Sequence, residues 1–280
     1  MRAPSISWLA LPALVLGALV DPATARSQRA PAEIPSATWL PMLRVAVREG
    51  AIDAPDSAHS GWTRIHTVKD GRPHTVVVFR LRDGVQPSAF LAALDTSSAT
   101  PSGGVALSGL EFLDSGELVI DLAPGHHVVA CILRGADGRR HHVKGESQVL
   151  VAAPARAAGR TARLPRASAE LRMVDFGYPG AERWRRGAYW VRVTNEGKQD
   201  HLVMIARLRE GATLRDWAES KEPRSVAAPV TGAARMGAGA TAYLPVVLER
   251  GRYVLYCSVP HGPTKTPHSK LGMFKEITVE

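Results

Sequence analysis

The feature that most constrains how this chain can fold is an internal repeat. His74–Gly84 recurs without a gap at His201–Gly211, an offset of 127 residues. Two further pairs of segments keep this order and almost this offset: Leu122–Cys131 with Leu248–Cys257, and His141–Glu146 with His268–Met273. Self-similarity of this kind indicates a structural unit that is built twice. The chain is therefore predicted to contain two copies of one fold in tandem.

Short apolar runs rich in β-branched and aromatic residues alternate with turn residues in both copies, which is typical of sandwiches or barrels of antiparallel strands. The expected strands are Thr75–Leu81, Leu118–Leu122, His127–Leu133, Tyr189–Thr194, Leu202–Leu208, Tyr243–Leu248 and Tyr253–Ser258. One helix is expected at the same place in each copy, because Thr213 and Asp216 have the spacing of a helix start and Pro87–Leu94 fills the matching position. Phe90 and Trp217 align in these helices and should pack them onto the sheets. We predict an all-β chain of two tandem β-sandwiches, each with one short helix.

The composition between the two copies indicates where the domains end. Residues 152–166 are rich in Ala, Pro and Arg and poor in bulky apolar residues, which is typical of a linker. We expect a flexible start at residues 26–35, a first domain at 36–153, a linker at 154–166 and a second domain at 167–280. Each domain is then long enough to bury its own core.

The N-terminus has the features of an export signal. Arg2 precedes an apolar stretch at Trp8–Val20, and Ala23-Thr-Ala25 supplies small residues for cleavage. The apolar stretch is shorter than the about 20 residues that a membrane-spanning helix needs. We expect residues 1–25 to be a signal peptide cut after Ala25. The mature chain should be periplasmic or secreted and should have no transmembrane segment.

Residues with sulfur or nitrogen donor atoms lie close together in the sequence near the C-terminus. Cys257 ends a predicted strand, His268 and Met273 follow on the next loop, and His201 opens an apolar run far upstream. A thiolate, two imidazoles and a weak thioether are the donors of a type 1 copper site. The residue types therefore point to copper that changes its oxidation state.

This order of residues resembles the cupredoxins, the plastocyanin- and azurin-like blue copper family. The resemblance implies Greek-key sandwiches and a copper held by His201, Cys257, His268 and Met273. It also implies a supporting role for Asn195, which precedes the first histidine as an Asn does in many cupredoxins. Ten residues separate Cys257 from His268, a longer loop than in small cupredoxins and similar to that of the blue copper domain of copper nitrite reductases.

That longer loop holds a rival imidazole. His261 lies closer to Cys257 in the sequence, but only His268 keeps the spacing of four residues before Met273. We therefore prefer His268 as the ligand and keep His261 as the alternative. A loop residue without a metal role is the simplest interpretation of His261.

The first copy keeps three donors and changes the fourth. His74, Cys131 and His141 match the second copy, but Glu146 stands where the second copy has Met273. A carboxylate is a harder ligand than a thioether, so this degenerate site is expected to hold a different metal, a low-potential copper or none.

The two cysteines also allow a disulfide in an oxidising compartment. Each cysteine ends a strand of its own repeat, whereas a disulfide needs Cα atoms within about 7 Å. We therefore disfavour this pairing. A buried free thiol that acts as a small apolar side chain is the other alternative, above all for Cys131.

The net charge and the sequence motifs limit the classes of function that this chain can have. The net charge of +9 favours an acidic partner such as a redox protein, and no nucleic-acid motif is present. The chain has no His-x-His pair, which multicopper oxidases need, and no Ser-His-Asp, paired-carboxylate or phosphate-loop pattern. We expect a protein that is not an enzyme and that transfers single electrons through one copper, with a second copper uncertain. The alternatives are a copper storage or delivery protein, and a metal-free structural or interaction module, on the same fold.

Overall fold

Strands dominate both copies of the repeat. The computed structural model describes residues 33–111, 115–155, 163–181, 183–262 and 264–280. In the first half these residues form β1 (Met42–Arg48), β2 (Ala51–Asp53), β3 (Ser57–His59), β4 (Gly61–Lys69), β5 (Val76–Leu81), α1 (Pro87–Thr96), β6 (Gly104–Leu110), β7 (Ser115–Leu122), β8 (Gly125–Cys131), the 3₁₀ turn η2 (His141–Lys144) and β9 (Ser147–Ala153).

The second half repeats this plan. Its elements are β10 (Ala167–Met173), β11 (Arg183–Trp184), β12 (Gly187–Asn195), β13 (His201–Leu208), α2 (Leu214–Glu219), α3 (Pro223–Val226), β14 (Ala227–Met236), β15 (Thr241–Leu248), β16 (Gly251–Tyr256), the 3₁₀ turn η3 (His268–Leu271) and β17 (Phe274–Val279). The predicted all-β class of sandwiches is confirmed. The one-turn helix α3 was not expected.

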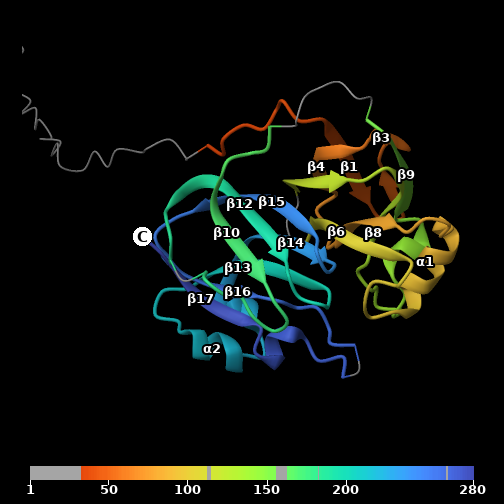
Figure 1. Cartoon of the computed structure of the whole chain (residues 1–280). Helices are drawn as coiled ribbons and strands as arrows, with labels where there is room; N and C mark the ends of the chain where they lie inside the picture. The colour runs from red at the N-terminus through yellow and green to blue at the C-terminus, as the bar shows by residue number, and fades with distance from the viewer. Residues whose placement is uncertain (1–32, 112–114, 156–162, 182, 263) are drawn as a thin grey trace, which may run out of the picture. The chain divides into compact units, whose positions relative to one another are not determined.

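Each half has a five-stranded sheet of its own, and both halves share a third sheet. The first sheet has the order β3-β9-β8-β5-β6, and its counterpart in the second half has the order β11-β17-β16-β13-β14. The shared sheet has seven strands in the order β10-β12-β15-β7-β4-β1-β2. Its two parts join where β15 pairs with β7 through Ala242 with Ile120 and Tyr243 with Val119. The two copies are therefore fused through one sheet (Figure 1).

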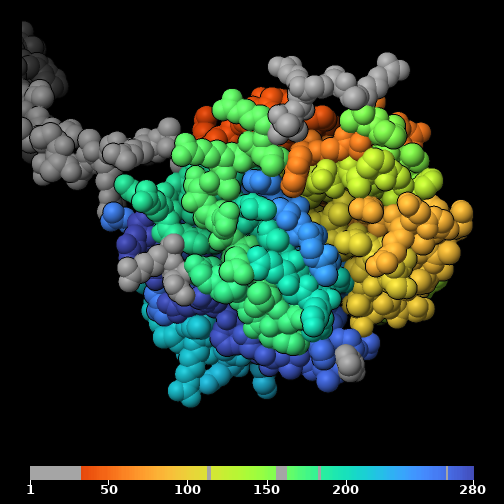
Figure 2. All heavy atoms as spheres, viewed as in Figure 1, coloured from red at the N-terminus to blue at the C-terminus, as the bar shows by residue number. Residues whose placement is uncertain are grey.

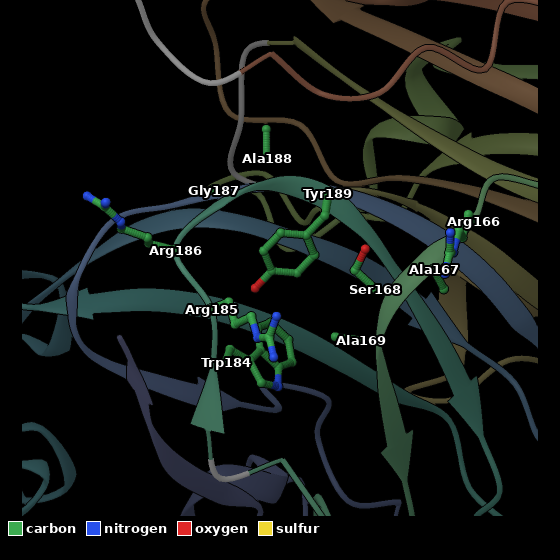
Figure 3. A pocket seen from close by; sticks show the side chains of 10 residues that line it. All are labelled: Arg166, Ala167, Ser168, Ala169, Trp184, Arg185, Arg186, Gly187, Ala188 and Tyr189. Carbon is green, nitrogen blue, oxygen red and sulfur yellow. The ribbon is translucent and has the colours of Figure 1, made fainter. Parts of the chain in front are cut away.

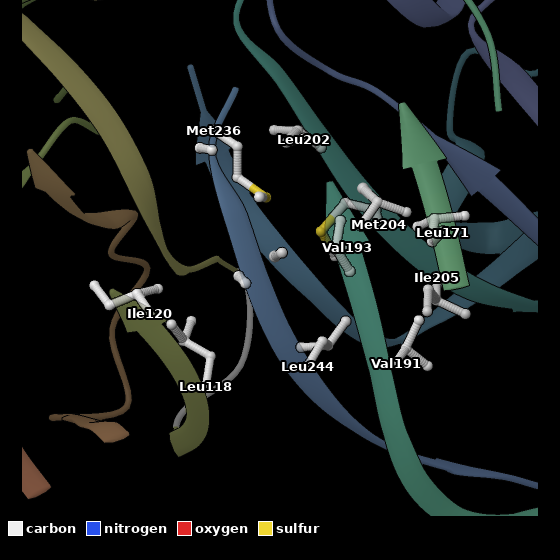
Figure 4. Packing of buried hydrophobic residues seen from close by; sticks show 14 of the residues in the cluster. Leu118, Ile120, Leu171, Val191, Val193, Leu202, Met204, Ile205, Met236 and Leu244 are labelled. Atoms are coloured by element: carbon white, nitrogen blue, oxygen red, sulfur yellow. The ribbon is translucent and has the colours of Figure 1, made fainter. Parts of the chain in front are cut away.

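The apolar core also runs through both halves. Leu118 and Ile120 of β7 belong to the same buried cluster as Val191 of β12, Met204 of β13 and Leu244 of β15 (Figure 4). In the space-filling view, the yellow and orange side chains of the first half meet the green and blue side chains of the second along a continuous boundary (Figure 2). The described residues consequently form one compact unit.

The predicted signal peptide at residues 1–25 and most of the predicted flexible start lie outside the described residues. Among the described residues, no helix is long and apolar enough to cross a membrane.

Helices cover the outer side of the sheets at matching places. Thr213 caps α2 by accepting a hydrogen bond from the backbone N–H of Asp216, whose carboxylate accepts from the backbone N–H of Thr213 in return. This reciprocal arrangement satisfies two N–H groups that a helix start otherwise leaves free. The predicted anchors Phe90 of α1 and Trp217 of α2 are both buried, and the Trp217 ring lies 5.0 Å from that of Tyr256.

Strand register places the predicted ligands at one end of each sandwich. In the second half, Met204 of β13 pairs with Tyr256 of β16, so the start of β13 lies beside the end of β16. In the first half, Val76 of β5 pairs with Cys131 of β8 in the same way. In both halves, the histidine at the start of one strand and the cysteine at the end of its neighbour therefore meet.

A glycine next to the first-half ligands tests this register. A side chain on Gly109 of β6 would overlap the carbonyl oxygen of Val76 in β5, so Gly109→Ala should separate the two strands and lower the free energy of unfolding by about 1–3 kcal/mol. Urea unfolding measures the loss. Gly262→Ala is the control, because no atom lies within 4 Å of its added carbon. Equal stability of the two variants would contradict the register.

Candidate metal centre

Three of the four ligands predicted in the second half come together. The ligand atoms of His201, Cys257 and His268 all lie within 4.8 Å of one another. The Nδ1 atom of His201 is 3.1 Å from the Nδ1 atom of His268, which is 3.6 Å from the Cys257 sulfur. All three side chains are buried. Two imidazole nitrogens and one sulfur therefore face a common point.

Met273 is brought back to this cluster by a tight turn. The turn η3 ends at Gly272, which adopts the left-handed φ of 103° that favours glycine. The backbone N–H of Cys257 then donates to the carbonyl of Met273, and the N–H of Met273 donates to the carbonyl of His268. Met273 is fully buried in the same apolar cluster as Cys257. Coordination by its sulfur stays a prediction.

A carboxylate sets the tautomer of His201. The Nε2 atom of His201 lies 2.9 Å from an oxygen of Asp175. An ionised carboxylate only accepts hydrogen bonds, so Nε2 carries the proton and Nδ1 keeps its lone pair. That lone pair faces the cluster. Such a partner behind the ring is typical of histidines that bind metals.

Asn195 closes the loop that leads into the first ligand. Its side-chain nitrogen donates to the carbonyls of Gln199 and Met236, and its oxygen accepts from the backbone N–H of Gly197. All of its side-chain bonds hold backbone in place. Asn195 therefore fixes where β13 begins and where His201 stands.

Burial determines the charge of the three donors. Burial lowers the pKa of His201, and it lowers the pKa of His268 to about 4, so both imidazoles are neutral at pH 7. Burial also raises the pKa of the Cys257 thiol to about 12, although its sulfur accepts a hydrogen bond from the backbone N–H of Leu202. The centre therefore offers two ready nitrogen donors. Its sulfur becomes a thiolate only if a cation compensates the charge.

His261 lies outside the cluster of donors. Its Nδ1 atom is 3.1 Å from the side-chain oxygen of Gln199, and its ring centre is 6.0 Å from that of His268. The three residues whose ligand atoms lie within 4.8 Å of one another include His268 and do not include His261.

Two contacts near the centre were missed from the sequence. Phe176 has a left-handed φ of 64°, which is uncommon for a bulky residue. Its ring lies 5.1 Å from that of His268, while its neighbour Asp175 holds His201. Both belong to the short turn at Val174–Gly177. No spacing signal marked this turn, because it is 26 residues from the nearest ligand.

The four residues predicted in the first half also form a cluster. The ligand atoms of His74, Cys131, His141 and Glu146 lie within 4.8 Å of one another. One oxygen of Glu146 is 2.8 Å from Nδ1 of His74 and 3.2 Å from Nδ1 of His141. Burial raises the pKa of the Cys131 thiol to about 12. The carboxylate therefore occupies the space between the two imidazoles.

This arrangement requires an additional proton or a cation. The other ring nitrogen of His74 lies 3.1 Å from an oxygen of Asp70, so His74 contacts two carboxylates. Carboxylates only accept hydrogen bonds, and a neutral imidazole has one N–H. Either an additional proton is shared among His74, Asp70 and Glu146, or a cation lies between His74 and Glu146. Cys131 and Cys257 are both free, so the alternative of a disulfide is not met.

A cleft at the far end of β12 is separate from these centres. It is lined by Arg166, Ala167, Ser168, Ala169, Trp184, Arg185, Arg186, Gly187, Ala188 and Tyr189 (Figure 3). Gly187 opens β12, whereas Asn195 beside the second-half centre ends it. Strands rise about 3.3 Å per residue. The cleft therefore does not belong to the metal centre.

Solved structures that match this chain include copper proteins. The "blue" copper protein auracyanin A from Chloroflexus aurantiacus is 12% identical over 41% of this chain and 100% of its own, with a TM-score of 0.28. A multicopper oxidase is 15% identical over 85% and 88% (TM-score 0.26). A copper nitrite reductase from Nitrosomonas europaea is 11% identical over 85% and 93% (TM-score 0.25). At identities of 11–15%, this likeness concerns the fold.

No family model and no curated protein matches the chain.

One expectation needs correction. The sequence led us to expect a protein that is not an enzyme, but structures that match 85% or more of the chain include multicopper oxidases and copper nitrite reductases, which are enzymes. The non-enzymatic interpretation is therefore wrong and is not retained. The missing His-x-His pair excluded only one way of building a copper enzyme.

Glu111, which follows β6, makes stability depend on pH. Burial raises the pKa of Glu111 to about 7 from an ordinary value of 4.5, although Arg235, Lys69 and Arg224 act to lower it. The folded chain therefore binds this proton more tightly than the unfolded chain does. Its contribution to stability is fully present below pH 4.5 and is lost as the pH rises through 7.

The substitution Glu111→Gln should remove this loss of stability at high pH. The variant should match the parent near pH 4 and exceed its free energy of unfolding above pH 7 by about 1–3 kcal/mol, because no buried charge forms. Urea unfolding from pH 4 to 8 measures the difference. Glu210→Gln, at an exposed position, serves as the control. A constant difference at all pH values would disprove ionisation of Glu111 as the cause.

Proposed function

We propose that the second-half centre binds one copper ion through His201, Cys257 and His268, with Met273 as a weak fourth ligand, and that it transfers single electrons. The supporting observation is the convergence of two Nδ1 atoms and one sulfur within 4.8 Å. Copper with a His₂Cys set and a long axial thioether is the type used in electron transfer. The donor set in this chain fits that metal.

The protein groups around the centre suit this role. When bound, copper would supply a reversible one-electron change of oxidation state. His201 is held by Asp175 in the tautomer that presents Nδ1. Sheet pairing and the η3 turn hold the other donors in place. A rigid frame of this kind keeps the donors still while the charge changes.

Export and an acidic redox partner complete the proposal. The N-terminal pattern of residues 1–25 favours cleavage and a periplasmic or secreted location. The net charge of +9 favours encounter with an acidic redox protein. An electron taken from such a partner can leave to another protein or to a reaction that this protein itself carries out.

The first-half cluster favours a second bound cation. Glu146 is a hard ligand, and His74 lies between two carboxylates. A divalent ion that accepts nitrogen, sulfur and oxygen donors, such as zinc or a low-potential copper, would supply the charge that this cluster needs.

The copper proposal predicts a colour that depends on one sulfur. Addition of Cu(II) to the parent should give an intense visible thiolate-to-copper band, and Cys257→Ser should abolish it because the only second-half thiol is lost. Cys131→Ser is the matched control and should keep the band. Visible absorption and metal analysis give the result. Loss of the band in the control alone would move the centre to the first half, and absence of any band would leave a storage protein or a metal-free module.

The second cation can be tested without the first centre. In a Cys257→Ser background, zinc titrated against a chromophoric chelator should still bind one equivalent, and Glu146→Gln should weaken that binding by at least about tenfold because an anionic ligand is lost. Glu170→Gln, an exposed change on β10, should have no effect. If Glu146→Gln leaves zinc binding unchanged, an additional proton, and not a cation, holds the cluster together.

A further inference from the structure

A cavity of about 240 Å³ lies between the two halves. It is lined from the first half by residues that include Thr75, Ile132 and Arg140, and from the second half by residues that include Leu202, Arg235 and Ser258. Five of these residues directly adjoin a predicted ligand in the sequence: Thr75 follows His74, Ile132 follows Cys131, Arg140 precedes His141, Leu202 follows His201 and Ser258 follows Cys257. The cavity therefore lies against the backbone of both centres.

Two arginines in its wall have unused hydrogen-bond donors. Arg140 is 6% exposed and Arg235 is 4% exposed. The terminal nitrogens of Arg140 donate to the carbonyls of Ile132 and Ser97, and one terminal nitrogen of Arg235 donates to the carbonyl of Ser98. The Nε–H group of each arginine is buried without a partner. A buried donor without a partner is costly, so these two groups point to a ligand.

The charge of the wall has the sign that an anion requires. Arg134, Arg140 and Arg235 line the cavity against the single carboxylate of Glu111. Arg235 pairs with Asp200 at 3.4 Å. Within the ranges that the structure describes, Arg140 has no ion pair and its guanidinium contacts neutral carbonyls. Arg140 is thus a buried positive charge without an ion-pair partner, and such a charge favours a bound negative charge.

We propose that this cavity binds a small anion with at least two acceptor oxygens, a carboxylate or an oxyanion, between Arg140 and Arg235. One oxygen accepts from the Nε–H of Arg140 and another from the Nε–H of Arg235. The cavity has room for roughly eight water volumes, which admits an ion of a few atoms and excludes a nucleotide. The unpartnered oxygen of Glu111 in the same wall opposes binding when it is ionised.

The inference is independent of copper, so it is tested on the metal-free protein. Arginine Nε–H signals are observed by ¹⁵N NMR while sodium nitrate replaces sodium chloride at constant ionic strength. The signals of Arg140 and Arg235, identified by their loss in Arg140→Lys and Arg235→Lys, should shift with one common saturation curve. The other arginine signals should stay in place. Shifts that grow linearly without saturation, or that spread over exposed arginines, would overturn the proposal.

Variants separate a specific site from general charge. Arg235→Lys should weaken the nitrate Kd by about tenfold, because a charge-assisted hydrogen bond is lost while the charge is kept. All Kd values are measured at pH 8, where Glu111 is ionised, and there Glu111→Gln should tighten binding because the opposing carboxylate charge is removed. Arg172→Lys, at the surface pair with Glu196, should leave the Kd unchanged. If Arg235→Lys does not fold, Glu111→Gln still decides: unchanged or weaker binding in that variant contradicts an anion at this position.

Discussion

Antiparallel pairing of two neighbouring strands in each half is the interaction on which the rest of the structure depends. His201 opens β13 and Cys257 follows β16, and the pairing of these strands brings the two donors together. A slip of one residue would turn every side chain of a strand to the other face and separate the donors. The 3₁₀ turns then return the third and fourth residues to the same place, and each ends on a left-handed glycine, Gly272 or Gly145. Strand pairing and the two turns therefore suffice to bring the donor residues of both clusters together.

On this common frame the two clusters differ through one residue. Met273 lets the second-half cluster remain free of charge, with two neutral imidazoles and a thiol that all avoid water. Glu146 places a negative charge between the imidazoles of the first-half cluster, and that charge must be balanced by a proton or a cation. The same arrangement of strands therefore holds a set of soft donors in the second half and a harder, charged set in the first half.

Fusion of the two copies adds features that neither copy has alone. The pairing of β7 with β15 continues one sheet across both halves, and the backbone N–H of Gly237 donates to the carbonyl of Ala106. The cavity between Arg140 and Arg235 exists only because the ends of the two sandwiches that carry the clusters face each other there. Its wall adjoins both clusters, so the charge inside it acts on both at short range.

The sequence by itself determined the features that depend on local pattern. The repeat and the alternation of strands and turns predicted the all-β class, the two helices anchored by Phe90 and Trp217, and the donor residues that strand register brings together. It led to a wrong conclusion on enzyme activity, because a missing motif says nothing about other ways to build a site. Only the tertiary structure decided the shared sheet, the support of His201 by Asp175 and the buried pair of Arg140 and Arg235. These depend on packing between segments far apart in the chain, for which residue spacing carries no signal.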